Sequence, residues 1–336
     1  MSALLRRALG VHVDPGEGDP VARRLSAAAA RRDWPAVREM FDGITDPDDR
    51  SFYTHVVGVV PGVEKWLTAV IRDEPYDATA LLLYGYRMTI LAWKARSSAG
   101  AEHVTREGWR KFFERLQIAE EALDQVVLKD PDNVTAWYTM MITSRGLQFG
   151  VAETRRRFDE VVSRHPGHLR AHQQLLQQLC VKWSGSHEAM YAFARESMNR
   201  APAGSPLGSL VAMAHLEYWL RTSGRTGRLD FRLNTRHFRT PKVRDELREA
   251  LDRSVRHPDY QRRPGWARVH NEFATALVLA GEHATAAEQF RTIGPHLTDV
   301  PWVYLTAVVP WQLSSRGYRS LTYLLSAFDR QSGPGR

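Results

Sequence analysis

The chain has 336 residues, of which 43% are hydrophobic and 25% are charged, and its formal net charge is +8. A chain of this length and composition buries a sizeable core, which excludes a miniature fold that depends on disulfides for its stability. The single cysteine, Cys180, cannot form an intrachain disulfide, and this fits a reducing compartment.

The N-terminal segment and the hydropathy of the chain predict a cytoplasmic protein. Arg6 and Arg7 interrupt the first apolar run before it reaches the length of a secretory signal core. No apolar stretch approaches the roughly 18 uncharged residues that a membrane span needs. We therefore expect a cytoplasmic location and no membrane partner.

Helical periodicity runs through most of the chain, and the period-two alternation of strands is nearly absent, which predicts an all-α fold. Proline dipeptides follow several expected helix ends: Glu74-Pro75, Asp130-Pro131, His165-Pro166, Ala201-Pro202 and His257-Pro258. Two of the intervals between these prolines are 35 and 36 residues, and the other two are 56 residues each. The shorter intervals match the period of ~34 residues that is common among helix-pair repeats, and the longer ones fit a pair with an insertion.

Capping residues predict where individual helices begin. In Asp130-Pro131-Asp132 the aspartate supplies a cap and the proline occupies the first turn, where its missing N–H costs nothing. Ser205-Pro206 repeats this arrangement before the next apolar helix. We therefore expect helices to start at both dipeptides.

Small and aromatic residues at set positions predict close helix pairs. Gly281 allows the chain to reverse in a left-handed conformation, and Ala286 lets the second helix approach the first, with Phe290 four residues later. Near the N-terminus Arg32 stands where such a turn would carry glycine. Gly85 supplies a small residue in a first helix.

These positions resemble the pattern of tetratricopeptide repeats, in which Trp137 stands where the first helix carries an aromatic residue, although Leu176 replaces the usual small residue in the unit at 166–200. The resemblance covers about residues 20–310. It implies a right-handed α-solenoid of tetratricopeptide-like helix pairs, about 12 to 14 helices, with one basic insertion. The stretch Lys182–Met190 is similar to segments of uncharacterised helical-repeat families, and the excess of arginine over lysine indicates a GC-rich, actinobacterial source.

The expected organisation is a single helical-repeat domain over residues 1–330 that is followed by a flexible tail. Its parts are divergent helix pairs at 20–129, regular repeats at 130–220, the basic insertion at 221–244, C-terminal repeats at 245–330 and the tail at 331–336.

The basic insertion carries seven arginines and one lysine against one aspartate, a net charge of +7. Arginine guanidinium groups bind carboxylates and phosphates, so an acidic partner or a nucleic acid is one interpretation. The other is that these arginines pair with acidic helix faces at Asp245, Glu246 and Glu249. The candidate residues for an acidic partner are Arg225, Arg228, Arg232, Arg236 and Arg239.

Histidines supply the few candidates for chemistry. His165, His168 and His172 form one run, but no cysteine or local carboxylate completes a metal site, so no metal or cofactor is expected. The candidate pairs for general acid–base catalysis are His187-Glu188 and His215/Glu217. Phosphate-binding loops and nucleophile elbows are absent, so no catalytic residue is assigned and an enzyme is not the favoured interpretation.

The leading hypothesis is a cytoplasmic protein-interaction module that binds an extended peptide or a partner helix in the concave groove of the solenoid. Amide side chains bond a peptide backbone, arginine holds a carboxylate, and aromatic rings add contact area. The candidate residues are Tyr84, Arg87, Trp137, Arg145, Gln173, Gln177, Trp183, His187, Tyr218 and Asn271. The alternatives are nucleic-acid or acidic-partner binding through 221–244, and a small-ligand binder or enzyme centred on Trp183, His187, Glu188, His215 and Glu217.

Overall fold

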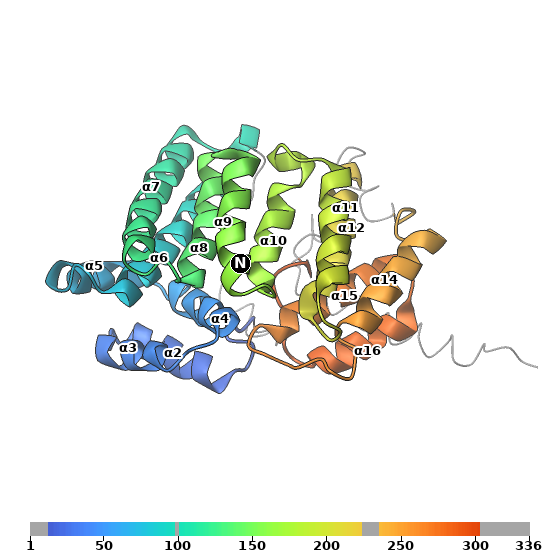
Figure 1. Ribbon diagram of the computed structural model, residues 1–336, viewed down its shortest axis with the longest axis horizontal. Helices are drawn as coiled ribbons and strands as arrows, with labels where there is room; N and C mark the ends of the chain where they lie inside the picture. The colour runs from blue at the N-terminus through green and yellow to red at the C-terminus, as the bar shows by residue number, and fades with distance from the viewer. Residues whose placement is uncertain (1–12, 98–100, 224–234, 303–336) are drawn as a thin grey trace, which may run out of the picture. The chain divides into compact units, whose positions relative to one another are not determined.

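The computed structural model describes residues 13–97, 101–223 and 235–302. These residues form 14 α-helices and short 3₁₀ turns without a β-strand, so the predicted all-α class is confirmed for them. None of the described helices is long and apolar enough to cross a membrane. The helices are drawn in chain order in Figure 1.

The chain divides into two compact units, which we call the N-terminal unit (residues 18–186) and the C-terminal unit (residues 187–336 with 1–17). The N-terminal unit contains α2 (Pro20–Ala30), α3 (Trp34–Asp42), α4 (Pro47–Gly58), α5 (Val63–Asp73), α6 (Ala78–Arg96), α7 (Arg106–Lys129), α8 (Val134–Leu147), α9 (Gly150–Arg164) and α10 (Leu169–Gln178). The C-terminal unit contains α11 (His187–Arg200), α12 (Ser209–Ser223), α14 (Pro241–Arg253), α15 (Trp266–Ala280) and α16 (His283–Ile293).

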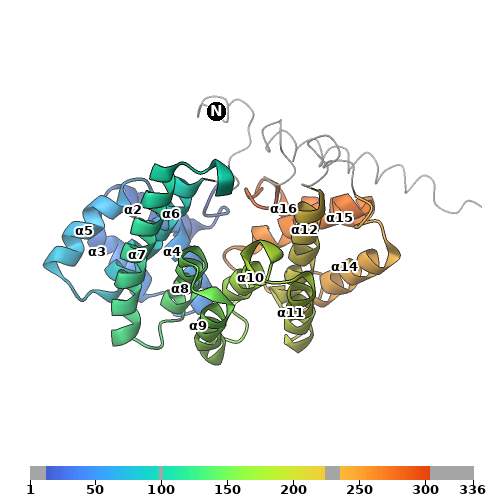
Figure 2. The same cartoon turned by 90° about the horizontal axis from the view of Figure 1, so that it is seen from above.

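In the N-terminal unit consecutive helices pack against one another, with α6 along α7, α7 along α8 and α8 along α9 (Figure 2). Gly85 explains how α6 and α7 come together, because a Cβ atom there would lie 2.9 Å from Cγ of Leu123. Leu82, Leu123 and Met140 form part of the shared core of α6, α7 and α8. The small residue therefore permits the close helix approach that the sequence predicts at this position.

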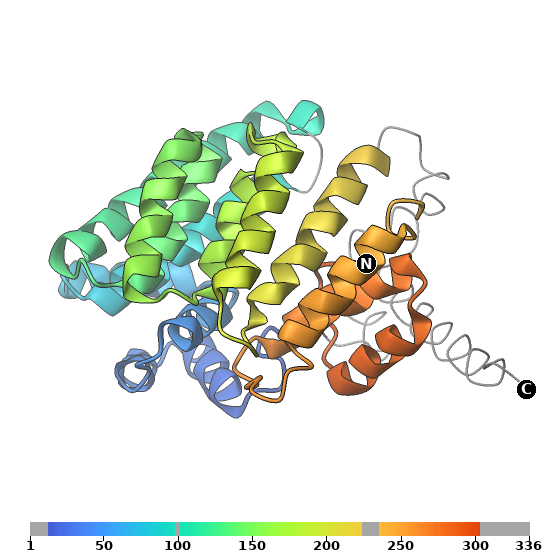
Figure 3. The same ribbon diagram turned by 45° about the vertical axis from the view of Figure 1, so that its right-hand side comes forward.

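In the C-terminal unit α12 is the central helix, because it packs against α11, α14 and α15 (Figure 3). Large aromatic residues from several segments fill the interior of this unit: Trp219, Phe238, Phe273, Phe290 and Trp302. Phe238 lies outside the helices, in the turn before α14, so this turn is anchored in the core. The anchor fixes the position of the neighbouring residue, His237.

Four of the five helix ends predicted from the proline dipeptides agree with the structure, whereas α14 ends at Arg253, ahead of His257-Pro258. Helices α5, α7, α9 and α11 each end directly before one of the proline dipeptides. The predicted start at Asp130 is wrong, because α8 begins at Val134 with Asn133 as its cap, and the Asn133 amide oxygen accepts from the backbone N–H of Ala136. Pro131 lies in the preceding turn, where its carbonyl accepts from Nε1 of Trp137.

The two predicted turns adopt the left-handed conformation. Gly281 ends α15 with φ +75°, and Ala286 and Phe290 are fully buried on α16. Arg32 takes φ +61° between α2 and α3, so it performs the same reversal without glycine. The sequence pattern therefore locates both turns correctly.

The predicted basic insertion at 221–244 is too wide at both ends. Residues 221–223 belong to α12, and residues 241–244 belong to α14, which Thr240 caps. Arg225, Arg228 and Arg232 lie outside the described residues.

Candidate functional site

Helices α11 and α12 bring several polar rings together in the C-terminal unit. His187, Tyr191 and Arg195 follow one another at four-residue spacing, which places them on one face of α11. His215 and Tyr218 are three residues apart on α12, so they also share a face. Since α11 packs along α12, these two faces meet.

The rings of His187, Tyr191, His215, Tyr218 and His237 contact one another, and we call these five residues the ring cluster. The centroid of Tyr218 is 4.4 Å from that of His237 and 4.8 Å from that of His187. The Tyr191 and His215 centroids are 5.0 Å apart. The cluster is therefore continuous from the first residue of α11 to the turn before α14.

A hydrogen-bonded chain of side chains runs through the ring cluster. His215 Nε2 lies 3.0 Å from Oε2 of Glu246 on α14. A carboxylate only accepts hydrogen bonds, so Nε2 of His215 carries a proton, and Nδ1 is the ring atom left for the other contacts. His237 Nε2 lies 3.0 Å and the Tyr191 hydroxyl 3.2 Å from this Nδ1 atom. The chain thus leads from His237 or Tyr191 through His215 to Glu246.

The surroundings determine the charge of each group. The hydrogen bond from His215 lowers the pKa of Glu246 to about 2, and Arg195 acts in the same direction. Burial lowers the pKa of His237 to about 4 and raises the pKa of Tyr191 above its usual value. At neutral pH the site therefore holds an ionised carboxylate, a neutral imidazole at His237 and a neutral phenol.

Solvent reaches the outer groups of the site and not its centre. His215 is 2% exposed, whereas His187, Tyr191, Tyr218 and His237 are half-buried. The Arg195 side chain is 39% exposed, and its Nη2 atom donates to both oxygens of Glu246. Its Nε–H and Nη1–H groups make no hydrogen bond within the described residues. An incoming ligand therefore finds aromatic faces and guanidinium donors at one place.

Two of the predicted acidic-partner residues flank this site. Arg236 and Arg239 are exposed on either side of the buried Phe238, in the turn that carries His237. They raise the positive potential near the ring cluster without pairing with it.

Three predicted groove residues lie in the interior instead of at a surface. Arg87 is buried and donates to Glu64 and to the carbonyl oxygen of Gly58. Asn271 is fully buried, where its amide bonds Trp302 and backbone carbonyls. Gln173 is also buried. The Arg87 guanidinium and the Asn271 amide bond groups of the fold itself, and all three side chains are buried, so the described structure does not present them at a surface.

The other predicted groove residues of the N-terminal unit are half-buried. Arg145 lies over the rings of Trp93 and Trp183, 5.6 and 5.7 Å from their centroids, and donates to Gln174. The Arg156 guanidinium lies over the ring of Trp137, 5.5 Å from its centroid. Tyr84 and Gln177 are likewise half-buried.

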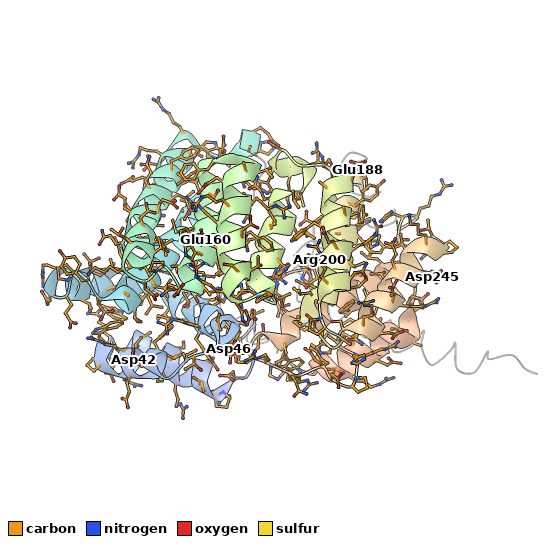
Figure 4. All side chains as sticks on the ribbon, viewed as in Figure 1. Asp42, Asp46, Glu160, Glu188, Arg200 and Asp245 are labelled. Atoms are coloured by element: carbon orange, nitrogen blue, oxygen red, sulfur yellow. The ribbon has the colours of Figure 1, made fainter. Side chains whose placement is uncertain are left out.

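The predicted acid–base pairs separate in the structure. Glu188 is exposed near the start of α11, where Figure 4 labels it, while Glu217 is buried on α12. The hydrogen-bonded carboxylate of His215 is Glu246, which is 31 positions away. Tyr191 and Arg195 are site residues that sequence reasoning missed, although their spacing from His187 was a usable signal. Nothing local in the sequence links Glu246 to His215.

The three histidines of the predicted run have separate environments. His168 is fully buried and lies 2.9 Å from the Ser51 hydroxyl through Nε2, while its Nδ1 accepts from the N–H of Ala171. His172 Nδ1 lies 2.9 Å from the carbonyl oxygen of His168, which is the N-cap of the same helix. His165 instead faces Asp48.

Comparison of the chain with protein-family models and with curated proteins finds no match. The candidate site therefore rests on its own geometry.

Proposed function

We propose that the protein is a binding module whose C-terminal unit holds a partner peptide through a carboxylate, either an acidic side chain or the free C-terminus. The observation that carries this proposal is the ring cluster with the half-exposed Arg195 beside it. The guanidinium group keeps N–H donors available after it has paired with Glu246, and the rings provide contact area for the rest of the peptide.

The charge around the site supports an acidic ligand over a basic one. Arg236 and Arg239 are exposed in the turn that carries His237, and the whole chain has a net charge of +8. Such a field increases the association rate of an anionic partner at low ionic strength. The resemblance of the helix pairs to tetratricopeptide repeats also supports peptide binding, because helical repeats present extended binding surfaces.

The test is fluorescence anisotropy with labelled decapeptide libraries that differ only at the C-terminus, one with a free carboxylate and the other amidated. We expect preferential binding of the free acid. Arg195→Gln and Tyr218→Ala should each weaken binding by at least about tenfold, which corresponds to ~1.4 kcal/mol. Arg200→Gln is the matched control, because Arg200 lies on the same helix, is exposed and pairs with Glu196.

Equal binding of both libraries together with unchanged affinity in Arg195→Gln would refute a carboxylate site on α11. Binding of a single-stranded oligonucleotide in preference to the peptides would support the nucleic-acid alternative. That alternative also predicts a steep linear dependence of log affinity on log salt concentration, whereas one carboxylate contact predicts a shallow one.

A second candidate function is general acid–base catalysis, which the chain from His237 through His215 to Glu246 favours. In this arrangement Glu246 orients His215, and a proton taken up at the half-buried His237 is shared with the buried ring. The probe is hydrolysis of p-nitrophenyl acetate. His237→Gln should abolish the catalysed rate, whereas His103→Gln, which changes an exposed histidine, should leave it unchanged. Equal rates in both variants would remove this candidate.

A further inference from the structure

A second cluster of chemically active side chains lies in the N-terminal unit, where the start of α4 meets the turn between α9 and α10. Asp46 is the N-cap of α4, and Figure 4 labels it at this end of the helix. Asp48 lies in the first turn of α4, and His165 follows the last residue of α9. Helix α10 packs against α4, which brings the two segments together although they are more than 100 positions apart.

The ligand atoms of this cluster converge. One carboxylate oxygen of Asp46, one of Asp48 and one ring nitrogen of His165 all lie within 4.8 Å of one another. Asp48 Oδ2 and His165 Nε2 are 2.8 Å apart. Two ligand atoms that share a zinc ion at bonds of 2.0–2.2 Å lie about 3 to 3.5 Å apart, so small side-chain movements would create the coordination geometry.

Backbone groups hold both carboxylates in place. The N–H of Leu169 donates to Asp48 Oδ1, while Oδ2 of the same carboxylate faces His165. Asp46 Oδ1 accepts from the N–H groups of Asp48 and Asp49. Hydrogen bonds of this kind orient metal ligands in known sites and reduce the entropy lost when the ion binds.

The charge of the cluster favours a cation. The ion-pair partners of Asp48 among the described residues are His165 and His168, and no lysine or arginine is one of them. His168 is fully buried and bonds Ser51. The arginines that are near in sequence have other contacts: Arg164 pairs with Asp132 and Glu160, Arg50 donates to the carbonyl oxygens of Phe41 and Ile44, and Arg170 lies over the ring of Phe52. Asp46 and Asp48 bring two carboxylates to the imidazole of His165.

We propose that Asp46, Asp48 and His165 bind one divalent transition-metal ion, with Zn²⁺ preferred and water completing its coordination. An imidazole ligand favours Zn²⁺ over Mg²⁺, which prefers an all-oxygen site. The metal takes the Nε2 lone pair of His165, and the proton on that nitrogen leaves to solvent. The ion joins α4 to the α9–α10 turn, so it stabilises the folded N-terminal unit.

The first experiment is calorimetric titration of the untagged, EDTA-treated full-length protein with ZnCl₂ and then, separately, with MgCl₂. We expect one Zn²⁺ ion per chain and an affinity for Mg²⁺ that is at least about tenfold weaker. Titration in two buffers of different protonation enthalpy should show proton release on Zn²⁺ binding. Absence of Zn²⁺ binding, or equal affinities for the two ions, would overturn the proposal.

Variants assign the binding to these residues. His165→Gln and Asp48→Asn should each weaken Zn²⁺ binding by at least about tenfold. Asp46→Asn is informative because asparagine preserves the helix cap while removing the charge, and it too should weaken binding. His103→Gln is the control, since His103 is exposed beside Glu102 in the same unit. Unchanged affinity in His165→Gln would place the ion elsewhere.

A measurement on the unchanged protein covers the case in which a variant fails to fold. Long-range ¹H–¹⁵N spectra of the histidine rings report directly on metal coordination of each nitrogen. We expect the Nε2 resonance of His165 to change with one equivalent of Zn²⁺ while that of His103 stays constant. A constant His165 resonance at saturation would overturn the proposal.

Discussion

Both units contain an arginine–glutamate pair, but the arginine is buried in the N-terminal unit and half-exposed in the C-terminal unit. In the N-terminal unit Arg157 is 5% exposed and donates to Glu120, Glu153 and the carbonyl oxygen of Met140. In the C-terminal unit Arg195 also pairs with a glutamate, Glu246, but its side chain is 39% exposed. Arg157 uses its donors for contacts inside the folded unit, whereas Arg195 keeps N–H groups that face solvent. An arginine–carboxylate pair therefore indicates a binding site only when the surrounding packing leaves the guanidinium group accessible.

Replacement of the two arginines gives the largest expected difference between the units. Arg157→Ala leaves Glu120, whose side chain is only 13% exposed, without its arginine partner, and we expect a loss of about 3–5 kcal/mol in the free energy of unfolding. Arg195→Ala should cost no more than ~1 kcal/mol, because solvent screens the 39% exposed guanidinium and His215 still bonds Glu246. Urea unfolding of both variants measures the difference. Equal losses of unfolding free energy in the two variants would contradict the contrast between the buried Arg157 network and the half-exposed Arg195 network.

Arg156→Ala is the matched control for Arg157→Ala. Arg156 lies next to Arg157 on α9 and also pairs with Glu153, but it is exposed. Its replacement should change stability by no more than ~0.5 kcal/mol.

A change to acidic pH tests the same contrast within the C-terminal unit, which contains the buried His270 as well as the half-buried His187 and His237. Burial lowers the pKa of His270 to about 4, and its ring bonds Gln289. Between about pH 6.5 and pH 4 the unfolded chain binds a proton that the folded state excludes, so stability falls as the pH falls through this window. We expect His270→Gln to reduce this loss by up to ~3 kcal/mol.

The measurement is chemical unfolding at pH 7 and at pH 4 for the wild type, His270→Gln and His237→Gln. His237 has a similarly lowered pKa, but it is half-buried, so its removal should reduce the acid sensitivity by less than that of His270. An identical pH dependence in the wild type and His270→Gln would show that His270 does not cause the loss.

Removal of one hydroxyl from each network gives the smallest expected difference between the two units. The Thr143 hydroxyl is fully buried and donates to Glu120, so Thr143→Val should cost about 1.5–3 kcal/mol. Tyr191→Phe removes a hydroxyl that lies near His215 and His237 at a half-exposed position, and about 0.5–1 kcal/mol is expected. Thermal unfolding compares the two. A larger cost for Tyr191→Phe would mean that the ring cluster is a closed structural network.

Local signals in the sequence predict much of the secondary structure. The ends of α5, α7, α9 and α11, the left-handed turns at Arg32 and Gly281, and the close approach at Gly85 all follow from properties of single residues and their neighbours. The start of α8 does not follow from such signals, because Asp130 and Asn133 are both suitable caps and only the structure shows that Asn133 bonds the first turn. Conformational preferences act over a few residues, so patterns of this length can report them.

The site depends on contacts that no local pattern contains. His215 meets Glu246 because α12 packs against α14, and His237 joins them because Phe238 is anchored in the core. In the same way, Asp48 meets His165 across a separation of 117 positions. By itself the sequence determined the helices, their turns and an excess of positive charge. Packing decided which polar groups are buried among partners and which remain open to a ligand, because burial depends on every element that covers a residue.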